Sequence, residues 1–204
     1  MSKYSKELLR KSFHILVTAF MIAWFYFYDD WKKIVLTVFV VMVLLYPLLY
    51  LASYIPGVSQ FVNARKKGEF SKSFVAVMIM YIIVATVCWG FLGQRLLGIA
   101  CILAWGPGDA AAALLGQKFG KHKIGRQKRK SLEGSLAMFV FSFISVLVVL
   151  FIYGRYGVVA TVIVALMTAL ASTIAELLVE NGFDTFYCPV AAMVVIVISE
   201  LLLR

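Results

Sequence analysis

The chain has 204 residues, of which 63% are hydrophobic and 15% are charged, and its formal net charge is +10. A soluble globular domain is usually about half apolar, so this composition excludes an ordinary soluble fold and favours a membrane protein. Seven apolar stretches are long enough to cross about 30 Å of hydrocarbon, which takes roughly 20 helical residues. They cover residues 12–28, 34–55, 74–93, 96–116, 136–153, 157–179 and 187–203. The sequence therefore predicts an all-α polytopic helical bundle in which residues 1–204 form one integral membrane domain.

Lysine and arginine residues indicate the orientation of the helices, because they concentrate in loops on the cytoplasmic side. With the N-terminus inside, 15 of the 20 cationic residues lie on the cytoplasmic side and 5 lie outside. Seven of the 15 fall in the fourth loop. We therefore expect a cytoplasmic N-terminus and an outer C-terminus, in a prokaryotic cytoplasmic membrane or a membrane of the endoplasmic-reticulum type.

The first helix follows a cationic start, but the aromatic run at 24–28 offers no small-residue cleavage site, so we expect this helix to be retained. At its entry, Arg10, Lys11 and His14 are candidates for contact with a phosphate or a lipid headgroup. The alternative for His14 is packing between helices at the interface. Glu69 in the second loop is a further candidate, with a surface ion pair to a neighbouring lysine as the alternative.

The fourth helix carries a carboxylate, Asp109, in the half that faces the cytoplasm. An ionised acid in hydrocarbon is costly, so it is a functional candidate by default. Gly106-Pro107-Gly108 precedes it and predicts a helix break just before Asp109. Such breaks are tolerated where the freed backbone faces protein or water, which would let Asp109 hold a hydrated divalent cation. The alternative is that Asp109 only caps a short helix over 110–118.

The fourth loop is crowded with cations and glycines. Charge alone makes it an anchor that fixes topology or a patch for anionic headgroups, but glycines also let backbone amides approach phosphate closely. The loop lacks the spacing of a Walker A motif. Cations together with magnesium can nevertheless hold a triphosphate, and the candidate cations are Lys121, Lys123 and Lys130.

The sixth helix ends in a pair of acids, Glu176 and Glu180, one turn apart on one face. At a buried helix end, two repelling carboxylates favour a shared cation, whereas at an exposed end they are simply solvated. Asn181-Gly182 then ends the helix before Asp184.

Two groups of residues are expected to have no part in chemistry. Three acids fall near the outer surface, where we expect solvation: Asp29, Asp30 and Glu200. Three cysteines lack the spacing of a metal site and are expected to be reduced packing residues: Cys88, Cys101 and Cys188.

The central part of the chain resembles the nucleotide-binding run of the CTP-dependent lipid kinases, which include dolichol kinase, phytol kinase and the CTP-type diacylglycerol kinase. The segments that carry this resemblance are Gly108-Asp109, Gly116 to Lys123 and Lys130 to Ala137. Further elements resemble the family in the same order: Arg10-Lys11 with His14, Glu69, and Glu176 through Asp184 to Pro189. The central run is also similar to phosphatidate cytidylyltransferase. The kinase ranks first because three helices of chain follow the run, whereas the other enzyme carries its signature near its C-terminus.

The resemblance implies a kinase that transfers the γ-phosphate of CTP to the hydroxyl of a lipid alcohol at the cytoplasmic face. It implies Mg²⁺ held by Asp109 with Asp184 or Glu176, and proton acceptance by Glu133 or Asp184. The residues expected to bind the nucleotide are Lys121, Lys123, Lys130, Ser131, Gly134, Ser135, Gly116 and Gly120. The expected partners are CTP, the lipid alcohol and the bilayer, without nucleic acid. The choice among a polyprenol, phytol and diacylglycerol stays open, as does the oligomeric state.

A transporter or channel that uses the broken fourth helix as an ion site is an alternative of a different class. It predicts internal repeats and polar residues along both halves of a path across the membrane. The chain shows no convincing repeat, and its polar residues gather on one side. This distribution favours an enzyme supplied from the cytoplasm.

Overall fold

A computed structural model describes residues 3–52, 54–55, 69–124, 130–179 and 183–203. The helices of these ranges are α1 (Lys3–Phe27), α2 (Trp31–Ala52), α4 (Glu69–Val84), the π-helix η1 (Ala85–Phe91), α5 (Arg95–Leu103), α6 (Gly106–Phe119), α7 (Leu132–Tyr153), α8 (Val158–Leu178) and α9 (Asp184–Leu203). Two short strands, β1 (Lys123–Ile124) and β2 (Lys130–Ser131), pair antiparallel. Seven helical stretches of the described chain are long and apolar enough to cross a membrane. The all-α polytopic bundle is therefore confirmed.

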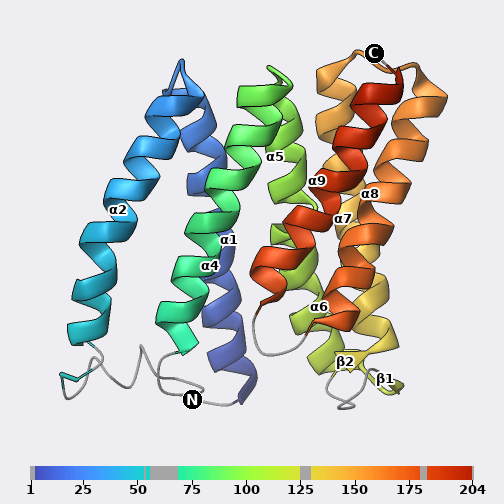
Figure 1. The fold of residues 1–204 in the computed structure, drawn as a ribbon. Coiled ribbons are helices and arrows are strands. Elements are labelled where there is room, and N and C mark those ends of the chain that lie inside the picture. Colours follow the sequence, from blue (N-terminus) through green and yellow to red (C-terminus); the bar gives the residue numbers. More distant parts are fainter. Residues whose placement is uncertain (1–2, 53, 56–68, 125–129, 180–182, 204) are drawn as a thin grey trace.

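The start of α1 and the end of α9 lie at opposite ends of the bundle (Figure 1), as an odd number of crossings requires. The strands β1 and β2 and the C-terminal end of α8 lie at the same end as the start of α1. We call this the basic end, and the opposite end, which carries the end of α9 and the turn between η1 and α5, the far end. Which of the two faces the cytoplasm stays a prediction.

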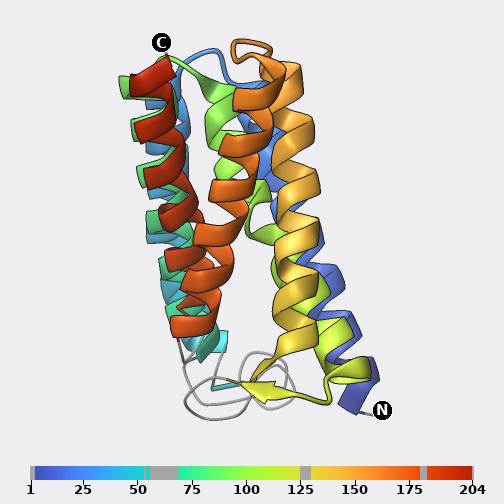
Figure 2. The ribbon, with the colours of Figure 1, turned by 90° about the vertical axis from the view of Figure 1, so that its right-hand side faces the viewer.

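The helices pack around α5, which touches α1, α7, α9 and η1. Helices that follow one another in the chain also pack together: α7 packs against α6 and α8, and α8 packs against α9. Helix α1 packs against α6, and the two lie side by side at the basic end (Figure 2). The residues of α5 from Leu97 to Ile102 are all buried among these neighbours, which agrees with their apolar character on every face.

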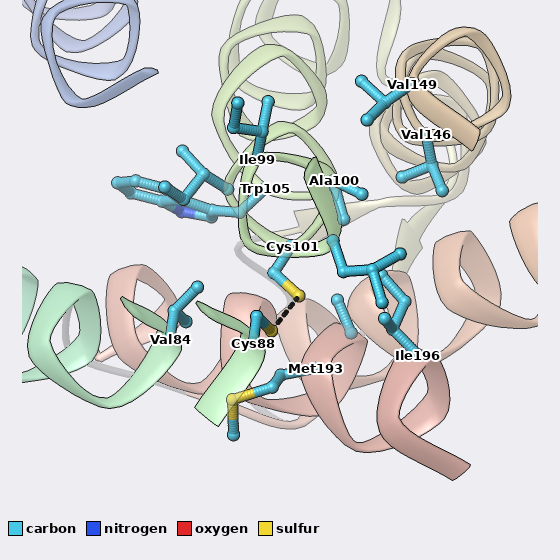
Figure 3. Close-up of a cluster of buried hydrophobic side chains, with 14 of the residues drawn as sticks. Val84, Cys88, Ile99, Ala100, Cys101, Trp105, Val146, Val149, Met193 and Ile196 are labelled. Carbon is cyan, nitrogen blue, oxygen red and sulfur yellow. Dashed lines mark hydrogen bonds between the residues drawn. The ribbon is translucent and has the colours of Figure 1, made fainter. Parts of the chain in front are cut away.

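The buried core contains all three cysteines, which are free, as the sequence predicts. Figure 3 shows Cys88 of η1 facing Cys101 of α5, with 3.8 Å between the two sulfur atoms. Trp105, directly before the start of α6, lies in the same core. These side chains join η1 to α5 by packing.

The fourth membrane-crossing stretch is broken, as predicted, although the break comes earlier than just before Asp109. Helix α5 ends at Leu103 and α6 begins at Gly106. Pro107 stands in the first turn of α6, where a missing backbone N–H removes no helical hydrogen bond. Asp109 lies inside this turn and its backbone N–H already donates to the carbonyl of Trp105 at 2.8 Å. It is therefore not the helix cap that the alternative interpretation required.

Candidate active site

The carboxylate of Asp109 is buried between α6 and α1. Lys11 and Asp109 are 4% and 8% exposed, and the ammonium of Lys11 donates a hydrogen bond to Oδ2 of Asp109. Nε2 of His14 lies 3.4 Å from the same oxygen. The spacing of three residues places Lys11 and His14 on one face of α1. A buried charge needs a partner. Helix α1 supplies the partners of the acid that follows the helix break.

Trp105 and His14 form a second layer beside Asp109. Their rings meet edge to face with centroids 4.3 Å apart, and Trp105 is 1% exposed. Within the described part of the chain, Nε1 of Trp105 has no hydrogen-bond partner, and Nε2 of His14 has none beyond its approach to Oδ2 of Asp109 at 3.4 Å. Buried polar atoms are nearly always paired in native structures, so this region favours a polar ligand. Sequence reasoning missed Trp105, since an aromatic residue in an apolar helix indicates only core packing.

The backbone freed by the helix break is satisfied by two serines from other helices. The carbonyl of Ala104 accepts from Oγ of Ser142 in α7 at 2.6 Å and from Oγ of Ser172 in α8 at 3.0 Å. Oγ of Ser142 also fills the space above Gly108, where a Cβ would come within 2.3 Å of it. The two serines therefore hold the start of α6, and with it Asp109, against α7 and α8.

A second ion pair joins β2, in the fourth loop of the sequence analysis, to α8. Nζ of Lys130 lies 3.0 Å from Oε1 of Glu176 and donates to the carbonyl of Val179, also at 3.0 Å. Glu176 is 8% exposed, and its other oxygen, Oε2, has no hydrogen-bond partner among the described residues. Lys130 thus caps the end of α8, and Glu176 keeps one acceptor available.

Asp184 is the first residue of α9, and its Oδ1 accepts from the backbone N–H of Thr185 at 3.0 Å. It lies close enough to Asp109, Lys11 and Lys130 for charge interactions. Glu176 in turn interacts electrostatically with Asp109 and Asp184. The structure therefore brings the three predicted acids, from three different helices, into one charged region.

Glu133 lies in the first turn of α7 and not before the helix as expected. Its Oε1 accepts from the backbone N–H groups of Lys121 and His122, each at 3.2 Å, and lies 2.8 Å from Nδ1 of His122. These contacts fasten the segment after α6 to the start of α7. The side chains of Lys121 and Lys123 remain exposed at the basic end.

The glycines that we expected at phosphate are sites of close helix packing. A Cβ on Gly134 would lie 2.9 Å from the carbonyl oxygen of Ala112 and 3.2 Å from Cα of Gly116. A Cβ on Gly120 would lie 2.5 Å from Oγ of Ser131, which itself accepts from the backbone N–H of Gly134 at 3.2 Å. Contact with phosphate stays a prediction for these residues.

The remaining candidates are less closely connected to Asp109. Ser135 is buried, and its Oγ has no partner among the described residues. Arg10 forms an ion pair with Glu7 on its own helix, within charge-interaction range of Asp109. Glu69 begins α4, but its side chain lies outside the described part of the structure, as does the whole of Glu180.

Glu200 corrects an expectation, because it is 2% exposed and not solvated. At the far end, its two carboxylate oxygens accept from the hydroxyls of Tyr153 at 2.9 Å and Tyr156 at 2.7 Å. Burial, reinforced by the hydrogen bond to Glu200, raises the pKa of Tyr156 and keeps its phenol a donor. Arg155 lies 3.5 Å from the same carboxylate. Glu200 therefore joins α9 to the connection between α7 and α8.

The described residues contain no group of three or more His, Cys, Asp or Glu side chains arranged to hold a metal ion. Mg²⁺, however, is usually bound by one or two carboxylates together with substrate phosphates and water. Asp109, Glu176 and Asp184 supply oxygen donors of the right kind, and Oε2 of Glu176 is an acceptor that these residues leave unused. The residues present therefore fit magnesium in their chemistry.

Comparison with known proteins agrees with the lipid-kinase resemblance. Over 67 residues the chain is 34% identical to phytol kinase 1, chloroplastic, of Arabidopsis thaliana, a match that covers 33% of this chain and 22% of that protein. Over 155 residues it is 28% identical to probable phytol kinase 1, chloroplastic, of Glycine max, covering 74% of this chain and 50% of that protein. The chain is similar to plant phytol kinases.

This similarity covers at most half the length of the relatives it matches. No protein-family model and no solved structure matches the chain. The similarity to phosphatidate cytidylyltransferase stays a prediction from the central run alone.

Proposed function

We propose that the chain is a membrane kinase that transfers the γ-phosphate of CTP to the hydroxyl of a lipid alcohol, with phytol or a related isoprenoid alcohol as acceptor. The observation that carries this proposal is the buried carboxylate of Asp109, held at a helix break beside Lys11 and His14. Its charge interaction with Glu176, which pairs with Lys130, connects it to the basic end and suits a substrate with several phosphates. Similarity to phytol kinases supports the choice of acceptor.

The proposed reaction forms a bond between the alcohol oxygen and the γ-phosphorus, breaks the bond from that phosphorus to the β–γ bridging oxygen, and releases CDP. Positioning and electrostatic stabilisation supply most of the catalysis in such transfers. Lys121 and Lys123, exposed at the basic end, would neutralise phosphate oxygens. Lys130 would do so from its position between the loop and α8.

The proton of the alcohol needs an acceptor, and Asp184 is the candidate that the contacts favour. Oε1 of Glu133 is occupied by three nitrogen atoms of Lys121 and His122, which assigns that residue to holding the loop. With Asp184 as the proton acceptor, Asp109 and Glu176 are the residues that would hold Mg²⁺. When bound, this ion would neutralise charge that develops on the phosphate oxygens.

The test uses the purified full chain, a panel of lipids and CTP labelled at either the α or the γ phosphate. The panel contains phytol, a polyprenol, diacylglycerol and phosphatidate. Incorporation of γ label into phytol is the expected result, and γ label in another alcohol would keep the kinase and change its acceptor. Incorporation of α label into phosphatidate would identify a cytidylyltransferase. Absence of label from every lipid would contradict both reactions.

A further inference from the structure

The far end of the bundle carries a cavity, widely open to its surroundings, that the proposed reaction does not use. Its volume is about 370 Å³, and it is lined by Asp29, Trp89, Gly93, Gln94, Arg95 and Leu96. It lies where η1 ends and α5 begins, next to the connection from α1 to α2. The ends of membrane-crossing helices lie at the level of the lipid headgroups, so this cavity faces that layer.

Arg95 gives the cavity a positive charge that its surroundings leave unneutralised. Its guanidinium carbon lies 5.4 Å from the ring centroid of Tyr26 and 6.0 Å from that of Trp89. Contacts of this kind hold a guanidinium in place through cation–π attraction. Asp29, the acid of the lining, forms its ion pair with Lys33 at 2.8 Å. Among the ion pairs of the described residues, none includes Arg95.

The backbone reinforces this positive charge. Arg95 is the first residue of α5, and Gln94 before it provides no side-chain cap. The first N–H groups of a helix lack intrahelical partners, and the helix dipole is positive there. Gly93 turns the chain with φ of 72°, and a Cβ at this position would meet no atom within 4 Å. The helix start is thus open to a ligand and attracts an anion.

Exposed apolar rings stand close in the chain to the residues that line the cavity, Phe27 two positions before Asp29 and Phe91 two positions before Gly93. Phe27 and Phe91, which end α1 and η1, are 84% and 75% exposed. At the level of the headgroups, the abundant anions are the phosphates of phospholipids, whose glycerol and acyl chains would lie against such rings. Arginine also binds phosphate through two parallel hydrogen bonds, which a planar guanidinium held between rings can offer.

We propose that this cavity binds the phosphate of a phospholipid headgroup in the leaflet opposite the candidate active site, with Arg95 as the residue that holds the phosphate. Tyr26 and Trp89 orient the guanidinium, and Phe27 and Phe91 contact the lipid body. The proposal does not depend on the kinase reaction, because it concerns the other end of the bundle.

The test is native mass spectrometry of the full chain in detergent, titrated with phosphatidylglycerol. Wild-type protein is expected to bind one phospholipid. Arg95→Gln should bind it about tenfold more weakly, because a charge-assisted hydrogen bond is lost. Arg155→Gln is the matched control, since Arg155 lies at the same end but contacts Glu200, and it is expected to bind as the wild type does. Equal binding by wild type and Arg95→Gln would overturn the proposal.

Two further measurements complete the test: one uses a competitor that lacks acyl chains, and the other uses a replacement variant of Arg95. Glycerol 3-phosphate at millimolar concentration carries the phosphate without chains, and displacement of the lipid by it at equal affinity would overturn the lipid assignment. If Arg95→Gln does not fold, Arg95→Lys replaces it. Weaker binding is then expected because an ammonium cannot bind phosphate in the bidentate geometry, and unchanged binding would contradict the proposal.

Discussion

The ammonium of Lys11 in α1 donates a hydrogen bond to the carboxylate of Asp109 in α6, although 98 positions separate them in the chain. Both residues are buried. The pair connects the first helix of the bundle to the broken fourth crossing. The candidate active site is consequently a product of tertiary packing, and neither helix forms it alone.

Removal of the lysine from this pair tests its contribution to stability. Lys11→Met leaves a buried carboxylate without its cation, which we expect to lower the free energy of unfolding by about 3 kcal/mol. The double variant Lys11→Met/Asp109→Asn should recover most of this loss, because it removes the charge together with its partner. Thermal unfolding in detergent measures both, and a single variant as stable as the wild type would contradict the assignment.

The two serines that bind the carbonyl of Ala104 should act together. Each of Ser142→Ala and Ser172→Ala removes one hydrogen bond, at a cost of about 1 kcal/mol. The double variant should cost more than the sum, since it leaves a buried carbonyl unpaired. Under the proposed function, kcat should also fall, because the start of α6 positions Asp109. Ser199→Ala is the control, since its hydroxyl donates to the carbonyl of Val195 on its own helix.

Close contact between α6 and α7 predicts the effect of a single added methyl group. Gly134→Ala places a Cβ 2.9 Å from the carbonyl oxygen of Ala112, so the helices must separate at a cost of about 1–3 kcal/mol. At Gly157, φ is −61° and a Cβ would meet no atom within 4 Å. Gly157→Ala should therefore be the milder change, and equal unfolding temperatures for the two variants would refute the packing interpretation.

The two buried glutamates at opposite ends should behave differently. Glu200→Gln weakens the hydrogen bonds from Tyr153 and Tyr156, so we expect lower thermal stability with phosphate transfer per folded molecule unchanged. Glu176→Gln should reduce transfer more than it reduces stability, because its carboxylate lies among the charged groups of the basic end. Loss of transfer by Glu200→Gln, with transfer by Glu176→Gln unchanged, would contradict the placement of the active site at the basic end.

The sequence was sufficient to predict the membrane bundle, and it singled out the acids of the candidate site. Asp109 and Glu176 could be recognised because carboxylates in or beside long apolar stretches are costly unless they serve a purpose. The break near Pro107 followed from the backbone properties of glycine and proline. Each of these features can be predicted from the residues next to it in the sequence.

Other features depend on partners that local composition does not reveal. Ser142 and Ser172 resemble ordinary small packing residues of membrane helices, and their shared partner is a carbonyl on a third helix. Glu200 was expected to be solvated because its tyrosine partners lie 44 and 47 positions earlier in the chain. To predict either contact, one must know which helices pack against each other.

The most direct test of the central claim is phosphate transfer from γ-labelled CTP to phytol by Asp109→Asn. Asparagine keeps an oxygen that can accept from Lys11 but removes the charge that neutralises this buried lysine, so transfer is measured per folded molecule. Asp30→Asn is the control, because Asp30 lies at the far end and accepts from the backbone N–H of Lys32, a role that asparagine preserves. We expect transfer to be abolished by Asp109→Asn and retained by Asp30→Asn. Wild-type transfer by folded Asp109→Asn would contradict the assignment of the active site.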